Sequence, residues 1–345
     1  MAQNSQQKSF TQWLLEAIEY KRPQFVNEAA KKFGVTRQTV NRELARLVAE
    51  GLIEASGHTR GRKYELSELK HAWVELDLKE KIEEDVVWRR EISPHLENAV
   101  PRNVYDICQH GFTEMLNNAI SHSEARRATV GLSLTAAEVK MFVMDDGVGI
   151  FNKIQHTYGL EDPRHAIFEL SKGKLTTDPD SHSGEGIFFA SRMFDKFEIN
   201  SAGLALMCEN DDDWLIEVDE EPSVMPGTWV LMRIATNSQR TTRHVFERFA
   251  ASHDDYGFSK THIPVALAKY GAEQLVSRSQ ARRLLARMDR FKEVILDFRG
   301  IDAIGQGFAD EIFRVFRNQN PNIEIMPLFA NSQVEAMIRH VEASK

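Results

Sequence analysis

The chain has 345 residues, of which 42% are hydrophobic and 27% charged, with a formal net charge of −8. This composition is typical of a soluble globular protein, and the length allows two or three domains of ~100–200 residues each. No stretch approaches the ~18 apolar residues of a membrane span, and residues 1–10 lack the apolar core of a signal peptide. The two cysteines, Cys108 and Cys208, have no metal-ligand spacing and favour a reducing compartment. We therefore expect a cytoplasmic protein with no membrane partner.

The net charge is unevenly distributed along the chain. Residues 1–70 carry 12 Lys and Arg against 8 Asp and Glu, whereas the remainder carries 31 against 43. A basic N-terminal region on an acidic body suggests an anionic partner for that region alone.

Residues 1–70 show the pattern of three helices followed by a β-hairpin. The helices are expected over 10–21, 24–33 and 37–50, with Thr36 as N-cap of the third and with Gly34 and Gly51 as stops. Short strands over 52–57 and 62–66 would flank a polar loop. Three helices and a hairpin make a winged helix-turn-helix, and the segment resembles bacterial transcription-factor domains of that type.

In such a fold the third helix enters the major groove of DNA and the wing contacts the backbone or the minor groove. Arg, Asn and Gln side chains can read guanine and adenine edges. The expected DNA-binding residues are Arg37, Gln38, Asn41 and Arg42 on the helix, and Arg60, Arg62 and Lys63 on the wing. The alternative is a protein-docking module with these residues in solvent, but the positive charge favours DNA.

Residues 71–94 are charged, with apolar residues at uneven helical spacing. We expect a connector with some helix, which could hold the contact of a homodimer.

Three polar residues recur at four-residue steps in the stretch 106–123. Apolar residues at roughly helical spacing predict one amphipathic helix, on which Glu114, Asn118 and His122 share a face. An amide oxygen suits Mg²⁺ and a carboxylate can polarise a water. Taken alone, the three residues are better explained as a solvated polar stripe.

Two later segments change that interpretation. A buried strand is expected to end at Asp145, before a turn with Gly147 and Gly149. After a long polar stretch, Gly184 and Gly186 lead into a helix whose N-terminus can bind phosphate. Ordinary turns at strand ends would explain each glycine pair by itself. They would not explain why the polar helix face and the two glycine pairs follow one another in this order.

The segment from about 83 to 234 resembles the GHKL ATPase superfamily, which includes gyrase, the heat-shock chaperone, histidine kinases and MutL. The resemblance implies a Bergerat-type α/β sandwich that binds ATP and Mg²⁺. It implies Asn118 as ligand of Mg²⁺, Glu114 as the water-activating base and Asp145 as acceptor for the adenine amino group. The implied ATP site also includes His122, Gly147, Gly149, Gly184, Gly186 and Thr228. Residues 152–183 would form a mobile lid, in which Lys172 and Lys174 could reach the γ-phosphate.

The last hundred residues alternate strands with helices and predict a small α/β domain. The stretch 294–313 is similar to the STAS fold of anti-sigma-factor antagonists, specifically to a STAS-like group of unknown function. That signature has a phosphorylatable serine where this chain has Gly305, Gln306 and Gly307. A phosphorylation switch at that turn is therefore not expected, and Asp297 and Asp302 receive no role.

The expected fold is a multidomain α/β (α+β) protein with a winged helix over 1–70, the connector 71–94, a GHKL domain over 95–236 and a STAS-like domain over 237–345. The favoured function is an ATP-binding, DNA-binding regulator. The alternative is an anti-sigma-type serine or histidine kinase-like protein that acts on a protein partner through its STAS-like domain. A gyrase-like clamp is a further alternative, although no phosphate-contacting lysine stands at an obvious place after Ile234. His95 and His110 do not fit the phosphoacceptor of a histidine kinase.

Overall fold

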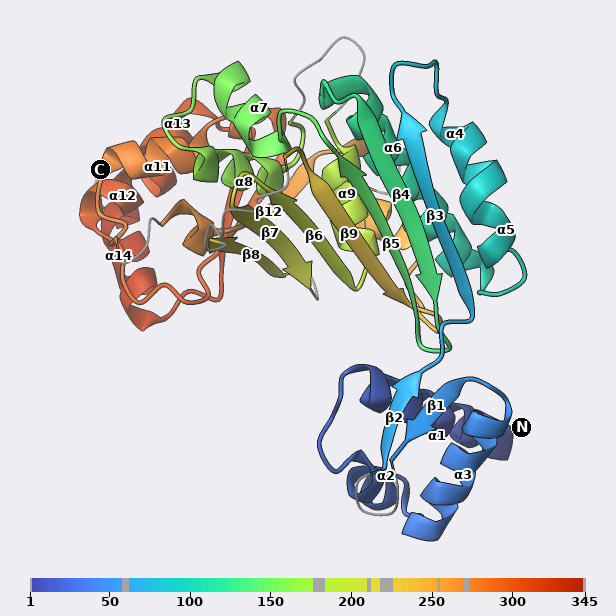
Figure 1. Ribbon diagram of the computed structural model, residues 1–345. Coiled ribbons are helices and arrows are strands. Elements are labelled where there is room, and N and C mark those ends of the chain that lie inside the picture. Colours follow the sequence, from blue (N-terminus) through green and yellow to red (C-terminus); the bar gives the residue numbers. More distant parts are fainter. Residues whose placement is uncertain are drawn as a thin grey trace.

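The computed structural model describes residues 2–57, 62–175, 184–209, 212–217, 226–252, 255–269 and 273–343. Three parts follow one another along the chain: a small helical unit with a β-hairpin, a seven-stranded sheet, and a three-stranded sheet with helices around it (Figure 1). This is the mixed α/β multidomain architecture that the sequence predicts.

The N-terminal unit has the expected three helices and hairpin. They are α1 (Ala2–Glu19), α2 (Phe25–Phe33), α3 (Arg37–Ala49), β1 (Ile53–Ser56) and β2 (Lys63–Leu66). The Thr36 hydroxyl caps α3 by accepting from Thr39 N at 3.1 Å, as predicted. Gly34 ends α2 with a φ of 64°, which a residue with a side chain rarely adopts. Val40, Leu44 and Leu47 of α3 are buried in the core of this unit.

The seven-stranded sheet is antiparallel throughout and has the order β3-β4-β5-β9-β6-β7-β8. Its strands are β3 (Lys70–Asp77), β4 (Arg127–Leu134), β5 (Glu138–Asp145), β6 (Lys196–Ser201), β7 (Leu204–Glu209), β8 (Asp212–Glu217) and β9 (Trp229–Ala235). Alternate residues of β5, such as Val139, Met141 and Val143, are buried as a half-covered strand requires. Helices α6 (Arg102–His122) and α9 (Gly186–Met193) pack against this sheet and against each other.

The expected connector is in part a strand of this sheet. Strand β3 pairs with β4 over its whole length, from Lys70 opposite Leu134 to Asp77 opposite Arg127. The helical part is α4 (Glu84–Val87), the π-helical turn η2 (Trp88–Ile92) and α5 (Ser93–Leu96). Ala72, Val74 and Leu76 alternate with more exposed residues, a period-two pattern that the expectation of a partly helical connector overlooked.

The expected lid region contains two helices. They are α7 (Ile150–Tyr158) and α8 (Pro163–Lys172), which pack against each other, and α8 also contacts the C-terminal part. Residues 176–183 of the expected lid lie outside the described residues.

The C-terminal part alternates strands and helices as predicted. It is built around the parallel sheet β12-β13-β14, formed by Lys260–Pro264, Glu293–Asp297 and Glu324–Leu328. Before this sheet come α10 (Thr242–Arg248), β10 (Ala250–Ser252) and β11 (Asp255–Phe258). The connections and the C-terminus contain η3 (Val265–Ala268), α11 (Arg278–Leu285), η4 (Met288–Arg290), α12 (Gln306–Asp310), η5 (Glu311–Phe316), α13 (Arg317–Gln319) and α14 (Ser332–Ala343).

Candidate functional site

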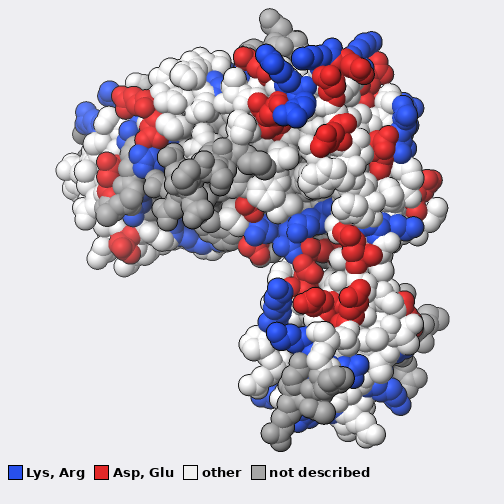
Figure 2. Space-filling view, in the orientation of Figure 1, with Lys and Arg blue, Asp and Glu red and all other residues white. Residues whose placement is uncertain are grey.

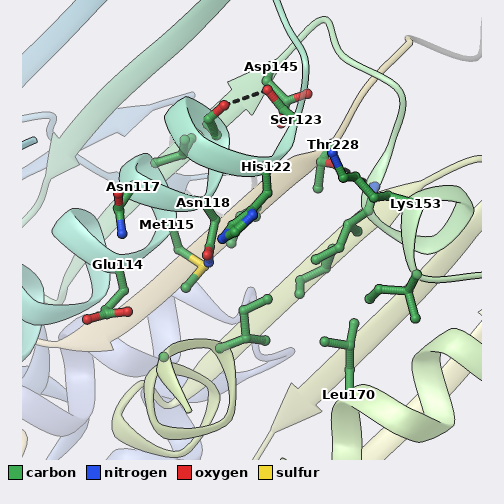
Figure 3. A pocket seen from close by; sticks show the side chains of 18 of the residues that line it. Glu114, Met115, Asn117, Asn118, His122, Ser123, Asp145, Lys153, Leu170 and Thr228 are labelled. Carbon is green, nitrogen blue, oxygen red and sulfur yellow. Dashed lines mark hydrogen bonds between the residues drawn. The ribbon is translucent and has the colours of Figure 1, made fainter. Parts of the chain in front are cut away.

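A cavity of about 310 Å³ lies between α6, α9 and the β5–β9 region of the sheet (Figure 3). Its lining combines segments that are far apart in the sequence. The predicted site residues that line it are Glu114, Asn118, His122, Asp145, Gly149, Gly184, Gly186 and Thr228. Gly147 is not part of the lining, but its backbone N–H donates to Asp145 Oδ1 at 2.9 Å. The fold therefore brings the predicted residues together at one place.

Helix α6 presents its polar face to the cavity. Glu114, Asn118 and His122 follow one another along this face (Figure 3). The other side of the helix, including Ile107 and Leu116, is buried in the hydrophobic core. Because helical residues four apart lie on one face, the core-facing residues determine which residues meet the cavity.

Asp145 ends β5 at the wall of the cavity. Its side chain is buried, and burial is the main reason that its pKa is raised to about 6. Its backbone N–H donates to Thr228 O at 2.9 Å, and the Thr228 hydroxyl accepts from Ile150 N at 3.0 Å. A carboxylate and a hydroxyl are thus fixed side by side, and at neutral pH the carboxylate is mostly ionised and accepts hydrogen bonds.

Two glycines of the site lie close to acidic residues. A Cβ on residue 186 would lie 2.0 Å from Glu114 Oε2, so a larger residue there would displace that carboxylate from its present position. Gly227 has a φ of 90°, and a Cβ there would lie 2.0 Å from Asp145 O. The glycine turns therefore position two acidic residues of the cavity as well as its backbone.

Sequence reasoning missed part of the lining. The missed residues are Met115, Asn117, Ala119, Ser123, Val143, Ile150, Lys153, Ile154, Leu170, Leu175, Ile187, Ile199 and Val230. Most of them form an apolar wall, which a local motif does not reveal. For Ile150, Lys153 and Ile154 a signal did exist, because they occupy one face of the first turns of α7, directly after Gly149.

The expected DNA-binding residues lie on one exposed surface of the N-terminal unit. Arg37, Gln38, Asn41 and Arg42 are exposed on α3, opposite its buried face, and Arg62 and Lys63 are exposed at the start of β2. Arg60 lies outside the described residues. The neighbouring Arg46 was not among the expected DNA-binding residues, and its guanidinium forms ion pairs with Glu43 of the same helix and with the C-cap residue Glu50.

Two family models match the ends of the chain. Residues 13–62 match the MarR family, and residues 280–335 match the STAS-like domain of unknown function (DUF4325). The chain thus carries a MarR-type winged-helix domain and a STAS-like domain. No curated protein matches the chain. Neither family match covers the cavity, so the GHKL assignment of the central region stays a prediction. Within the described residues, no helix is long and apolar enough to cross a membrane.

The two lysines expected to reach a phosphate contact the STAS-like domain instead. Lys172 is buried, and its Nζ donates to Glu169 at 2.8 Å and to the carbonyls of Arg283 and Ala286 at 3.0 and 3.2 Å. Lys174 Nζ donates to Arg290 O at 2.9 Å. Neither lysine lines the cavity, because contacts with residues more than a hundred positions away along the chain determine where these side chains lie.

The expected turn of the STAS-like domain contains Gly305, Gln306 and Gly307. A Cβ on Gly305 would lie 2.7 Å from Val276 Cα, so that position is closed to a side chain. Asp297 is buried and pairs with Arg299 and His262, which gives it a structural explanation.

The cavity residues fit a magnesium nucleotide. Their polar groups are an amide oxygen at Asn118, carboxylates at Glu114 and Asp145, and the backbone N–H groups at the start of α9. Within the described part of the chain, no cluster of three or more His, Cys, Asp or Glu could hold a metal alone. Proteins usually bind Mg²⁺ through one or two side chains together with substrate phosphates. The volume lies at the lower end of the ~300–1,000 Å³ typical of ligand pockets.

Proposed function

We propose that this protein is a DNA-binding regulator whose central region binds Mg-ATP. The observation that supports this most is the convergence of Glu114, Asn118, Asp145 and Gly186 on one cavity from three separate segments. A polar stripe on a helix or an isolated turn does not require such convergence. The MarR-type domain supplies the DNA-binding half of the proposal.

Each cavity residue has a task in this proposal. Asp145 accepts a hydrogen bond from the exocyclic amino group of adenine, beside the Thr228 hydroxyl. Asn118 holds Mg²⁺ together with the phosphates, and the ion neutralises part of their charge. The N–H groups at the start of α9 bind phosphate oxygens. Glu114 orients a water for slow hydrolysis.

The adenine contact is tested by calorimetric titration of the full chain. Wild type should bind ATP more tightly than GTP, because guanine presents a carbonyl where Asp145 requires a donor. Asp145→Asn and Asn118→Ala should each lose about 10-fold or more in ATP affinity, and Asn27→Ala, an exposed change on α2, should lose none. Equal ATP affinity of wild type and both cavity variants would sink the proposal.

The same residue predicts a pH dependence. Since the pKa of Asp145 is raised to about 6, its carboxylate becomes protonated as the pH falls through that value. ATP affinity of wild type should therefore decrease between pH 7.5 and pH 5.5, and that of Asp145→Asn should change less. If both proteins respond to pH alike, another group causes the effect.

The regulatory half is tested with DNA. Binding to genomic fragments near the gene should weaken steeply with salt, because Arg37, Arg42 and Arg62 displace counterions from phosphates. Arg37→Ala should reduce affinity, whereas Arg339→Ala on α14 should not. A non-hydrolysable ATP analogue should change DNA affinity by about 5–150-fold if the two sites are coupled. DNA affinity that ignores the nucleotide would leave two independent domains.

A further inference from the structure

Lys153 is the one Lys or Arg among the described residues that line the cavity. The acidic side chains of the lining are the carboxylates of Glu114 and Asp145. Figure 3 shows the Lys153 side chain among the residues that line the cavity, and it comes from α7 rather than from α6. A magnesium nucleoside triphosphate keeps a net negative charge, so a cavity with two carboxylates needs a cation to bind it well.

Backbone contacts fix the position of this lysine. Lys153 N donates to Gly149 O at 3.0 Å in the first turn of α7, and the same turn is held to the cavity wall by the bond from Ile150 N to the Thr228 hydroxyl. The ammonium group is therefore carried on an element that belongs to the cavity.

The other Lys and Arg side chains of the segment between the glycine turns do not line the cavity, and each has a contact elsewhere. Lys172 and Lys174 contact the STAS-like domain, as described above, and Arg164 pairs with Asp162 at 2.6 Å. Residues 175–191, which include the part outside the described residues, contain no Lys or Arg in the sequence. The charge requirement thus points to one residue.

The present partner of Lys153 is easily exchanged. Its Nζ lies 2.7 Å from Glu124 Oε1, and the Glu124 side chain is 65% exposed. Exposed ion pairs contribute only ~0–1 kcal/mol, because solvent screens both charges. A phosphate oxygen inside the cavity is less screened and makes a stronger charge-assisted hydrogen bond.

We propose that Lys153 is a phosphate-contacting residue of this cavity, which exchanges Glu124 for a phosphate oxygen when the nucleotide binds. The inference rests on the proposed function and adds to it a residue that sets the preference for phosphorylated ligands. It also assigns Glu124 a role as the competing anion at the mouth of the cavity.

The test is calorimetric titration of the full chain with Mg²⁺ and ATP, ADP, AMP or adenosine. Lys153→Met should lose about 10-fold or more in affinity for ATP, as expected for one charge-assisted hydrogen bond, and should bind adenosine as wild type does. Glu124→Gln should bind ATP up to about 5-fold more tightly, since it removes a surface competitor. Lys140→Met, on the exposed side of β5, is the charge-matched control and should change nothing.

The outcomes separate this inference from the function on which it rests. Wild type that binds ATP while Lys153→Met binds it equally well overturns the inference and leaves the proposed function intact. An equal loss for ATP and adenosine overturns it too, because the residue would then support the base or the fold. Wild type that binds none of the four ligands removes the proposed function and the inference together.

Discussion

The MarR-type domain has a hydrophobic core of its own and meets the central sheet through a small contact. The STAS-like domain, in contrast, shares one hydrophobic core with that sheet. Figure 1 shows the MarR-type domain beyond the β4–β5 turn, and the C-terminal part alongside α7 and α8.

The contact with the MarR-type domain is small and largely polar. Ala137 of the β4–β5 turn packs into the core of that domain. Arg233 of the sheet pairs with both Glu138 and Glu19, the last residue of α1, at 2.7 Å. Figure 2 shows acidic and basic side chains gathered on both sides of this junction.

The contact with the C-terminal part is aromatic and buried. Phe258 lies within 4.6 Å of Phe188 and 5.0 Å of Phe189, measured between ring centroids, and these two residues belong to α9. Since α9 begins at Gly186 of the cavity, the C-terminal part packs directly behind one wall of the candidate site. The comparison teaches that the MarR-type domain is held by the smaller, polar contact, whereas a shift of the C-terminal part would disturb a wall of the cavity.

The largest effect is expected from Phe258→Ala. Removal of this ring should destabilise the protein by about 3–5 kcal/mol, because it leaves a cavity in the shared core. Hydrogen–deuterium exchange should increase in β12–β14 and also in α9. The matched variant Phe10→Ala, in the other core, should increase exchange in α1–α3 alone. Increased exchange confined to the C-terminal strands in Phe258→Ala would break the comparison.

Lys172→Met should have a smaller effect at the same interface. Two carbonyls at the end of α11 would lose their donor, at a cost of about 1–3 kcal/mol in the free energy of unfolding. Lys174→Met, whose bond to Arg290 O is exposed, should cost less.

The same variant carries a pH signature. Burial lowers the pKa of Lys172 from 10.5 to about 8, so the unfolded state binds more protons between these values. Stability of wild type should therefore gain a contribution as the pH rises from 8 towards 10.5, and Lys172→Met should lack it. The measurement is thermal unfolding of wild type and Lys172→Met at several pH values across this range. If the stability of both proteins changes with pH in the same way, Lys172 does not cause the change.

The smallest effect should come from the polar junction. Burial raises the pKa of Glu138 to about 7 against the opposing effect of Arg233, and the negative charge of Glu19 adds to the rise. A raised carboxyl pKa means that the folded state binds the extra proton, so this contribution to stability is lost as the pH rises through about 7. Glu138→Gln should make the free energy of unfolding less dependent on pH between pH 5 and pH 8, by an amount on the order of 1 kcal/mol. An unchanged profile would show that Glu138 does not titrate in this range.

Local features of the protein could be predicted from its sequence. The amphipathic pattern of α6 placed Glu114, Asn118 and His122 on one face, and the cap at Thr36 marked the start of α3. Each of these depends on residues within one or two helical turns, where spacing and hydrogen bonding determine the geometry. The roles predicted for these side chains stay predictions until the titrations are done.

Contacts between distant segments were decided by the tertiary structure alone. The sequence shows Lys153, Lys172 and Lys174 as three similar lysines between two glycine turns. In the fold, the first lines the cavity, while the other two bind carbonyl groups of residues 283–290. Strand β3 does carry a local signal, since Ala72, Val74 and Leu76 alternate with more exposed residues, but its place at the edge of the sheet beside β4 is a tertiary contact. The contacts of a long flexible side chain depend on which carbonyls and carboxylates the packed core brings near it. Those partners are distant in the sequence, so local residue spacing does not predict them.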